Sequence, residues 1–312
     1  MQSQSIKQLL IIAAHPSIAA SRRAVEVVNQ LGHLFKAEVL IRRTEDPRAA
    51  LQEGVADFAL QPADKMPPCI AKGTRIAAIP RRETAAESLL ARLGGLLTTT
   101  ANPFGVMKGA RVWVKSSRQA AQILAVCQAS VEIVEDGSNS LLQCLVAGQC
   151  DAVMLPTVDL MEHPDLGAFD VATLHPEVAL PAPGQGGLVM ESREDDTRFP
   201  DLATIDDPQS ARCISCERHL LELFDQDPAL GCLATTEPDG GIRLQAVFPE
   251  LQIEENTATI SRVGAVSKEP DQAALACHDA LRSALSSAVY KTPGIATKRH
   301  EKEANKTAVP AL

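Results

Sequence analysis

Two short motifs have residue types and spacings that could do chemistry by themselves. Cys213 and Cys216 are three residues apart, and His219 follows one helical turn later, which is part of the ligand spacing of a zinc site. The sequence has no second cysteine pair at the distance that a zinc site needs, and all three residues fall on one expected helix. A packed helix face explains them better than a metal, so we expect no metal site.

The second motif is glycine-rich. Gly184-Gln185-Gly186-Gly187 has the composition of a phosphate-binding loop, but the Lys-Ser/Thr pair that follows such loops is absent. The stretch also precedes an expected strand, whereas a phosphate loop opens a helix. The remaining histidines have no Ser, Asp or Cys partner pattern. Neither nucleotide binding nor a hydrolytic triad is therefore expected.

Composition and charge exclude two classes of partner. The chain has 312 residues, a net charge of −9 and a pI near 5.3, which opposes binding to nucleic acid and to anionic membranes. No apolar run is long enough to span a bilayer. The eight cysteines are scattered, without the dense spacing of a secreted scaffold. These features favour a soluble protein in the reducing cytoplasm.

The elements that must position any site alternate along the chain. The first block has expected strands at 9–14, 38–42, 57–60 and 75–79, and expected helices at 25–35, 48–53 and 84–93. Residues 98–109, rich in Thr, Pro and Gly, are expected to cross to a second block. That block has strands at 111–114, 130–134 and 151–155 and helices at 118–127 and 140–147. Such alternation predicts doubly wound α/β sheets.

The rest of the chain completes the expected architecture. Turn-rich residues 180–187 lead into a strand at 188–191 that returns to the first block, which predicts a hinged cleft between two lobes. After Pro200, helices at 213–224 and 272–289 and strands at 242–248 and 257–263 predict a small α+β domain. The expected domains are residues 1–100 with 188–210, then 101–187, then 211–292, followed by a polar, disordered tail at 293–312.

Three segments, in order along the chain, resemble the porphobilinogen deaminase (hydroxymethylbilane synthase) family. They are residues 54–60, residues 180–187 with the sequence Leu-Pro-Ala-Pro-Gly-Gln-Gly-Gly, and the Leu-Gly-Cys stretch at 230–232 that follows Glu217-Arg218. The resemblance implies two lobes like those of periplasmic binding proteins and a small third domain. The alternation of elements indicates the same architecture independently.

The resemblance also implies a reaction. Members of the family join four porphobilinogen units, with loss of ammonia, into linear hydroxymethylbilane for porphyrin and heme biosynthesis. They do so on a dipyrromethane cofactor held by a thioether to one cysteine, which matches Cys232 here. The chemistry requires a thiolate on a loop, and Gly231 would let the backbone bring the sulfur into the cleft. Without the resemblance, Cys232 is interpreted as a small buried side chain before a strand.

Five other residues acquire expected roles from the resemblance. Ser116, Ser117, Arg118 and Gln185 are expected to contact the cofactor, in a monomer whose small-molecule partner is porphobilinogen. Asp64 is the candidate catalytic carboxylate, which would stabilise an azafulvenium cation and handle protons. In the family this carboxylate ends a His-Ser-x-Lys-Asp stretch, whereas Asp64 precedes its lysine. A solvated loop aspartate is the alternative.

The sequence also departs from the family where that family binds carboxylates. Guanidinium groups are the natural partners of pyrrole acetates and propionates, and Arg118 is the one arginine left of a family pair. The lid segment with its Gly-Lys-Gly stretch is missing between Asp46 and Pro47. Other family arginine positions are occupied by residues 135–137, Leu141 and Glu162. Two hypotheses therefore stay open: a divergent enzyme of this family, and a non-catalytic protein that binds a small ligand on the same scaffold.

Overall fold

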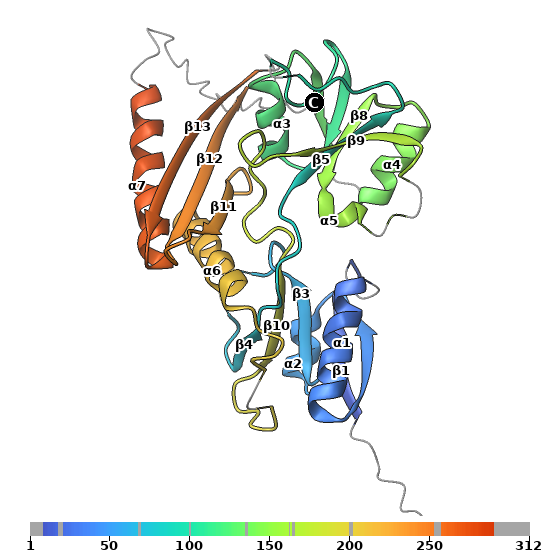
Figure 1. The fold of residues 1–312 in the computed structure, drawn as a ribbon, viewed down its shortest axis with the longest axis vertical. Helices are drawn as coiled ribbons and strands as arrows, with labels where there is room; N and C mark the ends of the chain where they lie inside the picture. The colour runs from blue at the N-terminus through green and yellow to red at the C-terminus, as the bar shows by residue number, and fades with distance from the viewer. Residues whose placement is uncertain are drawn as a thin grey trace, which may run out of the picture.

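Two α/β lobes and a small C-terminal sheet domain make up the molecule, which confirms the predicted fold class (Figure 1). The computed structural model describes residues 9–17, 21–67, 70–99, 101–134, 137–161, 163, 166–199, 202–252 and 257–289. The expected tail at 293–312 and the substituted positions 135, 136 and 162 lie outside the described residues.

Lobe 1 is a five-stranded sheet with helices on both faces. Its strands lie in the order β2-β1-β3-β10-β4, with β1 parallel to β2 and β3, and β10 antiparallel to β3 and β4. Alternate residues of β1 face the core beneath α1 and the smaller core beneath α2. The elements are β1 Leu9–Ala14, α1 Arg22–Phe35, β2 Glu38–Arg43, α2 Pro47–Gln52, β3 Phe58–Pro62, β4 Thr74–Ala78 and β10 Leu188–Arg193.

Lobe 2 repeats the same topology. Its order is β7-β6-β8-β5-β9, with β6 parallel to β7 and β8, and β5 antiparallel to β8 and β9. Helix α3 covers one face of the sheet and α4 covers the other. The elements are β5 Glu87–Arg92, β6 Arg111–Val114, α3 Ser117–Leu124, β7 Ser130–Ile133, α4 Ser138–Val146, β8 Ala152–Pro156, α5 Thr157–Leu160 and β9 Phe169–Leu174.

The structure corrects two expectations about the first crossing between the lobes. Residues 84–93 were expected to be helical, but residues 87–92 form β5, because Leu89 and Leu90 are buried on opposite faces of a central strand. Strand β5 pairs within the second sheet, although the boundary expected at residue 100 assigned it to the first domain. The chain therefore crosses near 79–86, and the stretch at 98–109 packs inside lobe 2 through Phe104.

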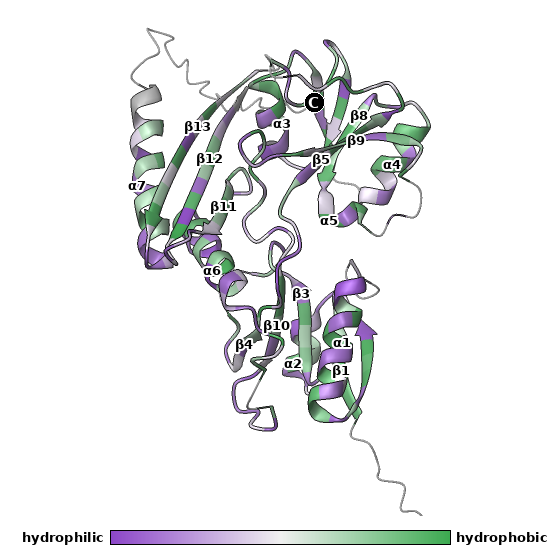
Figure 2. Cartoon of the chain, viewed as in Figure 1, coloured by the Kyte–Doolittle hydropathy of each residue, from purple (hydrophilic) through white to green (hydrophobic). Residues whose placement is uncertain are grey.

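The C-terminal domain is an antiparallel sheet covered by two helices. Helices α6 (Pro208–Leu223) and α7 (Pro270–Val289) pack on one face of β11 (Gly231–Thr236), β12 (Ile242–Gln252) and β13 (Thr257–Ser267). Helix α3 of lobe 2 packs against β12 and β13. Figure 2 shows apolar colour along the inner strands β3 and β8, while α1 alternates between polar and apolar turns. The cores thus lie between the sheets and their helices.

The two chain segments that connect the lobes lie against each other. The Gln185 side-chain amide donates to the carbonyl of Ala85 at 2.8 Å, and Arg82 Nε donates to the Gln185 carbonyl at 2.8 Å. Gly186 has a φ of +75°, and a Cβ at that position would lie 1.8 Å from the Thr84 carbonyl oxygen. Only glycine allows this close crossing, which forms the floor of the cleft between the lobes.

Candidate functional site

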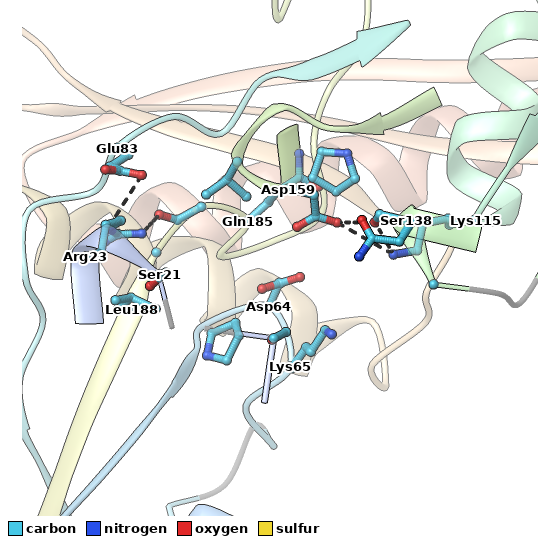
Figure 3. A pocket seen from close by; sticks show the side chains of 18 residues that line it. Ser21, Arg23, Asp64, Lys65, Glu83, Lys115, Ser138, Asp159, Gln185 and Leu188 are labelled. Atoms are coloured by element: carbon cyan, nitrogen blue, oxygen red, sulfur yellow. Dashed lines mark hydrogen bonds and ion pairs between the residues drawn. The ribbon is translucent and has the colours of Figure 1, made fainter. Parts of the chain in front are cut away.

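A cavity of about 380 Å³ lies between the lobes (Figure 3). Its walls are the loops that follow the carboxyl ends of β1, β3, β6 and β8, together with the start of α4 and the return crossover. Ligands of open α/β sheets bind at such strand ends. The polar side chains in the lining are Ser17, Ser21, Arg23, Asp64, Lys65, Glu83, Lys115, Ser138, Asn139, Asp159 and Gln185.

Asp64 and Lys65 come from lobe 1, in the turn that follows β3. The turn is closed by the Lys65 N–H, which donates to the Pro62 carbonyl at 3.2 Å. Figure 3 shows Asp64 between Lys65 and the lobe 2 side chains. Its side chain is accessible to solvent, yet protein surrounds it within the cleft. This loss of bulk water raises the pKa of Asp64, and the nearby Lys65 ammonium acts in the opposite direction.

Lobe 2 contributes a connected polar group on the opposite wall. The Ser138 hydroxyl, at the first turn of α4, donates to Asp159 Oδ2 at 2.5 Å. Lys115 Nζ donates to the Ser138 hydroxyl at 3.2 Å and lies 3.7 Å from Asp159 Oδ2. The charges of Lys115 and Asp159 therefore compensate each other within the wall of the cleft.

Arg23 on α1 is the arginine of the cavity lining, and it is almost fully buried. Its Nη1 donates to the Gly186 carbonyl at 2.6 Å, and its Nε lies 3.8 Å from Glu83 Oε2. Burial lowers the pKa of Arg23, and Glu83 acts in the opposite direction. The guanidinium thus holds the return crossover in place and has its charge balanced by a carboxylate.

Three of the predicted cofactor contacts lie away from this cavity, among the residues described. Ser116 is the N-cap of α3, where its hydroxyl accepts from the Gln119 N–H at 3.2 Å, and Ser117 is the first residue of that helix. Arg118 is buried, donating to Glu87 Oε1 at 2.6 Å and to the Leu180 carbonyl. In this structure its guanidinium is engaged by a buried carboxylate and lies outside the cavity lining, so its contact with a cofactor stays a prediction.

Gln185 lines the cavity, but its side chain is committed to the structure. The amide nitrogen donates to the carbonyls of Ala85 and Ala86, at 2.8 and 3.3 Å, and the amide oxygen accepts from the Ala182 N–H at 3.3 Å. The hydrogen bonds of the Gln185 side chain therefore link the two crossovers to each other. Of the predicted residues, only Asp64 and Gln185 line the cavity.

Cys232 lies on strand β11 and not on a loop, which corrects the expected placement. Its side chain is 0% exposed and packs with Cys216, Leu220 and Cys277 beneath the helices of the C-terminal domain. Burial raises the pKa of this thiol well above its ordinary value, with the Glu217 charge acting in the same direction. In this structure the sulfur therefore faces the core of the C-terminal domain and lies outside the cavity lining.

Sequence reasoning missed Lys115, Ser138 and Asp159, together with Arg23 at the cavity floor. The signal that could have found them was the topology. Lys115 follows β6 directly and Asp159 follows β8, so both come after parallel strands whose carboxyl ends meet at one edge of the sheet. None of the described groups of His, Cys, Asp and Glu is arranged to hold a metal ion. None of the described helices is long and apolar enough to cross a membrane.

Comparisons with known proteins identify relatives of the chain. Residues 19–201 match the family model described as porphobilinogen deaminase, dipyrromethane cofactor binding domain. The chain is 33% identical over 204 residues to porphobilinogen deaminase of Sorangium cellulosum, across 64% of this chain and 66% of that protein. It is 28% identical over 276 residues to porphobilinogen deaminase of Mycolicibacterium gilvum, across 83% and 81% respectively.

The matched stretch thus spans just under two thirds of the length of the Sorangium protein. Cys232 lies beyond the residues that match the family model. Among solved structures, an ancestral cationic amino acid solute-binding protein aligns with a TM-score of 0.43 at 15% identity, covering 69% of this chain and 90% of that one.

Proposed function

Because the chain belongs to the porphobilinogen deaminase family, we propose that it binds porphobilinogen in the cleft between its lobes and acts on it in tetrapyrrole biosynthesis. The observation that supports this proposal is the position of Asp64, which stands in the cavity opposite Ser138 and Asp159. Porphobilinogen is a pyrrole with an aminomethyl group, an acetate and a propionate. It therefore offers N–H donors to Asp64 and carboxylates to the lysines of the cleft.

The proposed chemistry assigns Asp64 to the deamination step. The bond between carbon and nitrogen of the aminomethyl group breaks, and ammonia leaves with the electron pair, so that an azafulvenium cation remains. A carboxylate beside the ring N–H stabilises this cation. When the α-carbon of a second pyrrole attacks, a new C–C bond forms and the proton lost from that carbon passes to the carboxylate. The raised pKa of Asp64 brings this proton exchange closer to neutral pH.

A second candidate function is a non-catalytic protein that binds porphobilinogen and releases it unchanged. The observation that favours it is the burial of Cys232, the residue expected to carry the dipyrromethane on which the family assembles its product. The arginines also favour this second candidate, because Arg23 and Arg118 each form an ion pair with a glutamate of the protein. Both functions share the same ligand and the same cleft, and they differ in turnover.

Substrate consumption and binding, measured side by side, test the proposal. The purified protein is incubated with porphobilinogen, while ammonia release and tetrapyrrole absorbance are followed and affinity is measured by calorimetry. Asp64→Asn is expected to lower turnover by about 100-fold or more, the usual contribution of a positioned acid or base. The exposed Asp195 lies outside the cavity, so Asp195→Asn should behave as the wild type.

Each outcome separates the candidates. Turnover that depends on Asp64 supports the enzyme, whereas binding with unchanged porphobilinogen supports the non-catalytic protein. A wild-type protein that shows neither binding nor turnover would refute the proposed function.

A further inference from the structure

We infer that Asp159 binds the aminomethyl ammonium group of porphobilinogen, so that the cleft holds the positive charge of its substrate between two carboxylates, one on each wall. The inference rests on the proposed function and deepens it, because it names a further substrate-binding residue of the same site. Three observations carry it: the open oxygen of Asp159, the way in which the fold anchors this side chain, and its position opposite Asp64.

The first observation is that one carboxylate oxygen of Asp159 is open to the cavity. Oδ2 accepts from the Ser138 hydroxyl at 2.5 Å and lies 3.7 Å from Lys115 Nζ. Within the described part of the chain, Oδ1 has no hydrogen-bond or ion-pair partner. Asp159 lines the cavity, and its side chain is 35% exposed. Because an ionised carboxylate accepts several hydrogen bonds, an ammonium group can bind Oδ1 while Oδ2 keeps its partners.

The second observation is that the fold holds Asp159 in place. This residue lies on the short helix α5, which follows β8 directly, and the next residue, Leu160, is buried in the core of lobe 2. At the start of α5, the Thr157 N–H donates to the Ala86 carbonyl at 2.9 Å. These contacts and the Ser138 hydrogen bond orient the carboxylate before a ligand arrives, which lowers the entropy cost of binding.

The third observation is the position of Asp159 across the cavity from Asp64. Figure 3 shows the Asp159 carboxylate of lobe 2 directed toward that of Asp64 of lobe 1. Loss of bulk water is the largest cause of the raised pKa of Asp64, and the Asp159 charge acts in the same direction. Lys65, a backbone hydrogen bond and Lys115 act in the opposite direction. The two carboxylates therefore interact electrostatically, and a cation between them is attracted by both.

Two carboxylates on opposite walls suit a reaction in which the positive charge moves. Before the bond between carbon and nitrogen breaks, the charge lies on the aminomethyl ammonium, where Asp159 binds it. When the bond breaks, its electron pair leaves with neutral ammonia and the charge passes to the azafulvenium ring, where Asp64 stabilises it. This cation is the one that the second pyrrole attacks in the condensation. Lys115 stays beside Asp159 and compensates its charge once ammonia has left.

The affinities for two ligands test the assignment. The ligands are porphobilinogen and its analogue in which a methyl group replaces the aminomethyl group, so that both carboxylates are kept and the ammonium is lost. Calorimetry uses the Asp64→Asn variant, in which low turnover leaves porphobilinogen intact. This variant should bind porphobilinogen about 10- to 100-fold more tightly than the analogue, the usual effect of one charge-assisted hydrogen bond. Adding Asp159→Asn should weaken porphobilinogen alone and make the two affinities similar.

A matched control and a kinetic measurement complete the test. Asp195 is exposed and lies outside the cavity, so adding Asp195→Asn should leave the discrimination unchanged. With Asp64 intact, Asp159→Asn should raise KM about 10- to 100-fold and lower kcat by less than about 10-fold, whereas Asp64→Asn acts mainly on kcat. A structural defect would weaken both ligands alike, so the affinity for the analogue reports whether the cleft is intact.

The failures of the two proposals can be told apart. Discrimination that persists when Asp159→Asn is added, or equal weakening of both ligands, would overturn this inference and leave the proposed function standing. If Asp64→Asn binds the two ligands equally, or loses the porphobilinogen that the wild type binds, the ammonium is bound by Asp64 and not by Asp159. If neither the wild type nor Asp64→Asn binds porphobilinogen, the proposed function is wrong and the inference falls with it.

Discussion

Glu217→Ala should lower the stability of the protein, because Glu217 connects the two crossovers between the lobes to the C-terminal domain. Glu217 on α6 is fully buried, and its carboxylate accepts from Arg82 Nη1 at 2.6 Å and Nη2 at 3.2 Å. It also accepts from the backbone N–H groups of Gly184 at 2.7 Å and Ala234 at 2.8 Å. One side chain therefore connects both crossovers to strand β11.

The expected loss of stability follows from the buried groups that the substitution leaves without a partner. Removing one partner of a buried ion pair costs about 3–5 kcal/mol, because the remaining charge is uncompensated. The two orphaned N–H groups, each worth roughly 1–3 kcal/mol when buried and unsatisfied, act in the same direction. A loss of this size lowers Tm by roughly 10 °C. Glu217→Gln keeps an oxygen acceptor but removes the charge, so its effect should be smaller.

Thermal and urea unfolding measure the effect, with Glu222→Ala as the matched control. Glu222 lies on the same helix and is exposed, so its substitution should change stability by less than about 0.5 kcal/mol. Small-angle scattering should also show a wider distribution of overall dimensions for Glu217→Ala than for the wild type. If Glu217→Ala unfolds at the same temperature as Glu222→Ala, the carboxylate does not stabilise this connection and the reasoning is refuted.

Three further substitutions or measurements follow from the structure. Gly186→Ala should destabilise the protein by at least about 2 kcal/mol, since the added Cβ overlaps the Thr84 carbonyl at a positive φ, whereas Gly167→Ala meets nothing within 4 Å and should fold normally. In native protein, Cys232 should resist a thiol-specific reagent that modifies the half-buried Cys144, and modification of Cys232 at the Cys144 rate would contradict its burial. Asp64→Asn should raise Tm at pH 7 and not at pH 3. The pKa of Asp64 in the folded state lies above 3.8, so the native state binds this proton more tightly and wild-type stability falls as pH rises from 3.8 through the raised pKa. A Tm difference of the same size at both pH values would show that the Asp64 charge is not responsible.

Local patterns predicted most of the fold, and the exception shows their limit. The strands and helices of lobe 1 up to β4 follow from apolar periodicity and from caps such as Ser21, whose hydroxyl accepts from the Ala24 N–H. Residues 87–92, Glu-Ser-Leu-Leu-Ala-Arg, favour a helix by composition but form β5. Pairing with β8 and β9 decides this strand, and a pairing between residues more than 60 positions apart leaves no local signal.

The site was predictable only where a residue follows a strand in the expected order. Asp64 follows β3 and was predicted as a site residue. Because it precedes Lys65, in the reverse of the family's order, the sequence did not show which way its side chain points. Ser138 and Asp159 come from different loops and meet only because the sheet brings its strand ends together. The placement of Cys232 could not be predicted from Gly231 beside it, because a glycine before a cysteine suits a loop and a tightly packed strand alike.

The use of arginine connects the fold to the ligand. Three fully buried glutamates, at positions 87, 191 and 217, each bind one arginine, and each pair joins elements that are distant in sequence. Arg118 ties α3 to β5, Arg48 ties α2 to β10, and Arg82 ties the first crossover to α6. A guanidinium compensated in this way holds elements together and no longer offers charge to a carboxylate ligand. Arg48, Arg82 and Arg118 are therefore committed to the fold, and none of them lies in the lining of the cleft, where the cationic side chains are those of Arg23, Lys65 and Lys115.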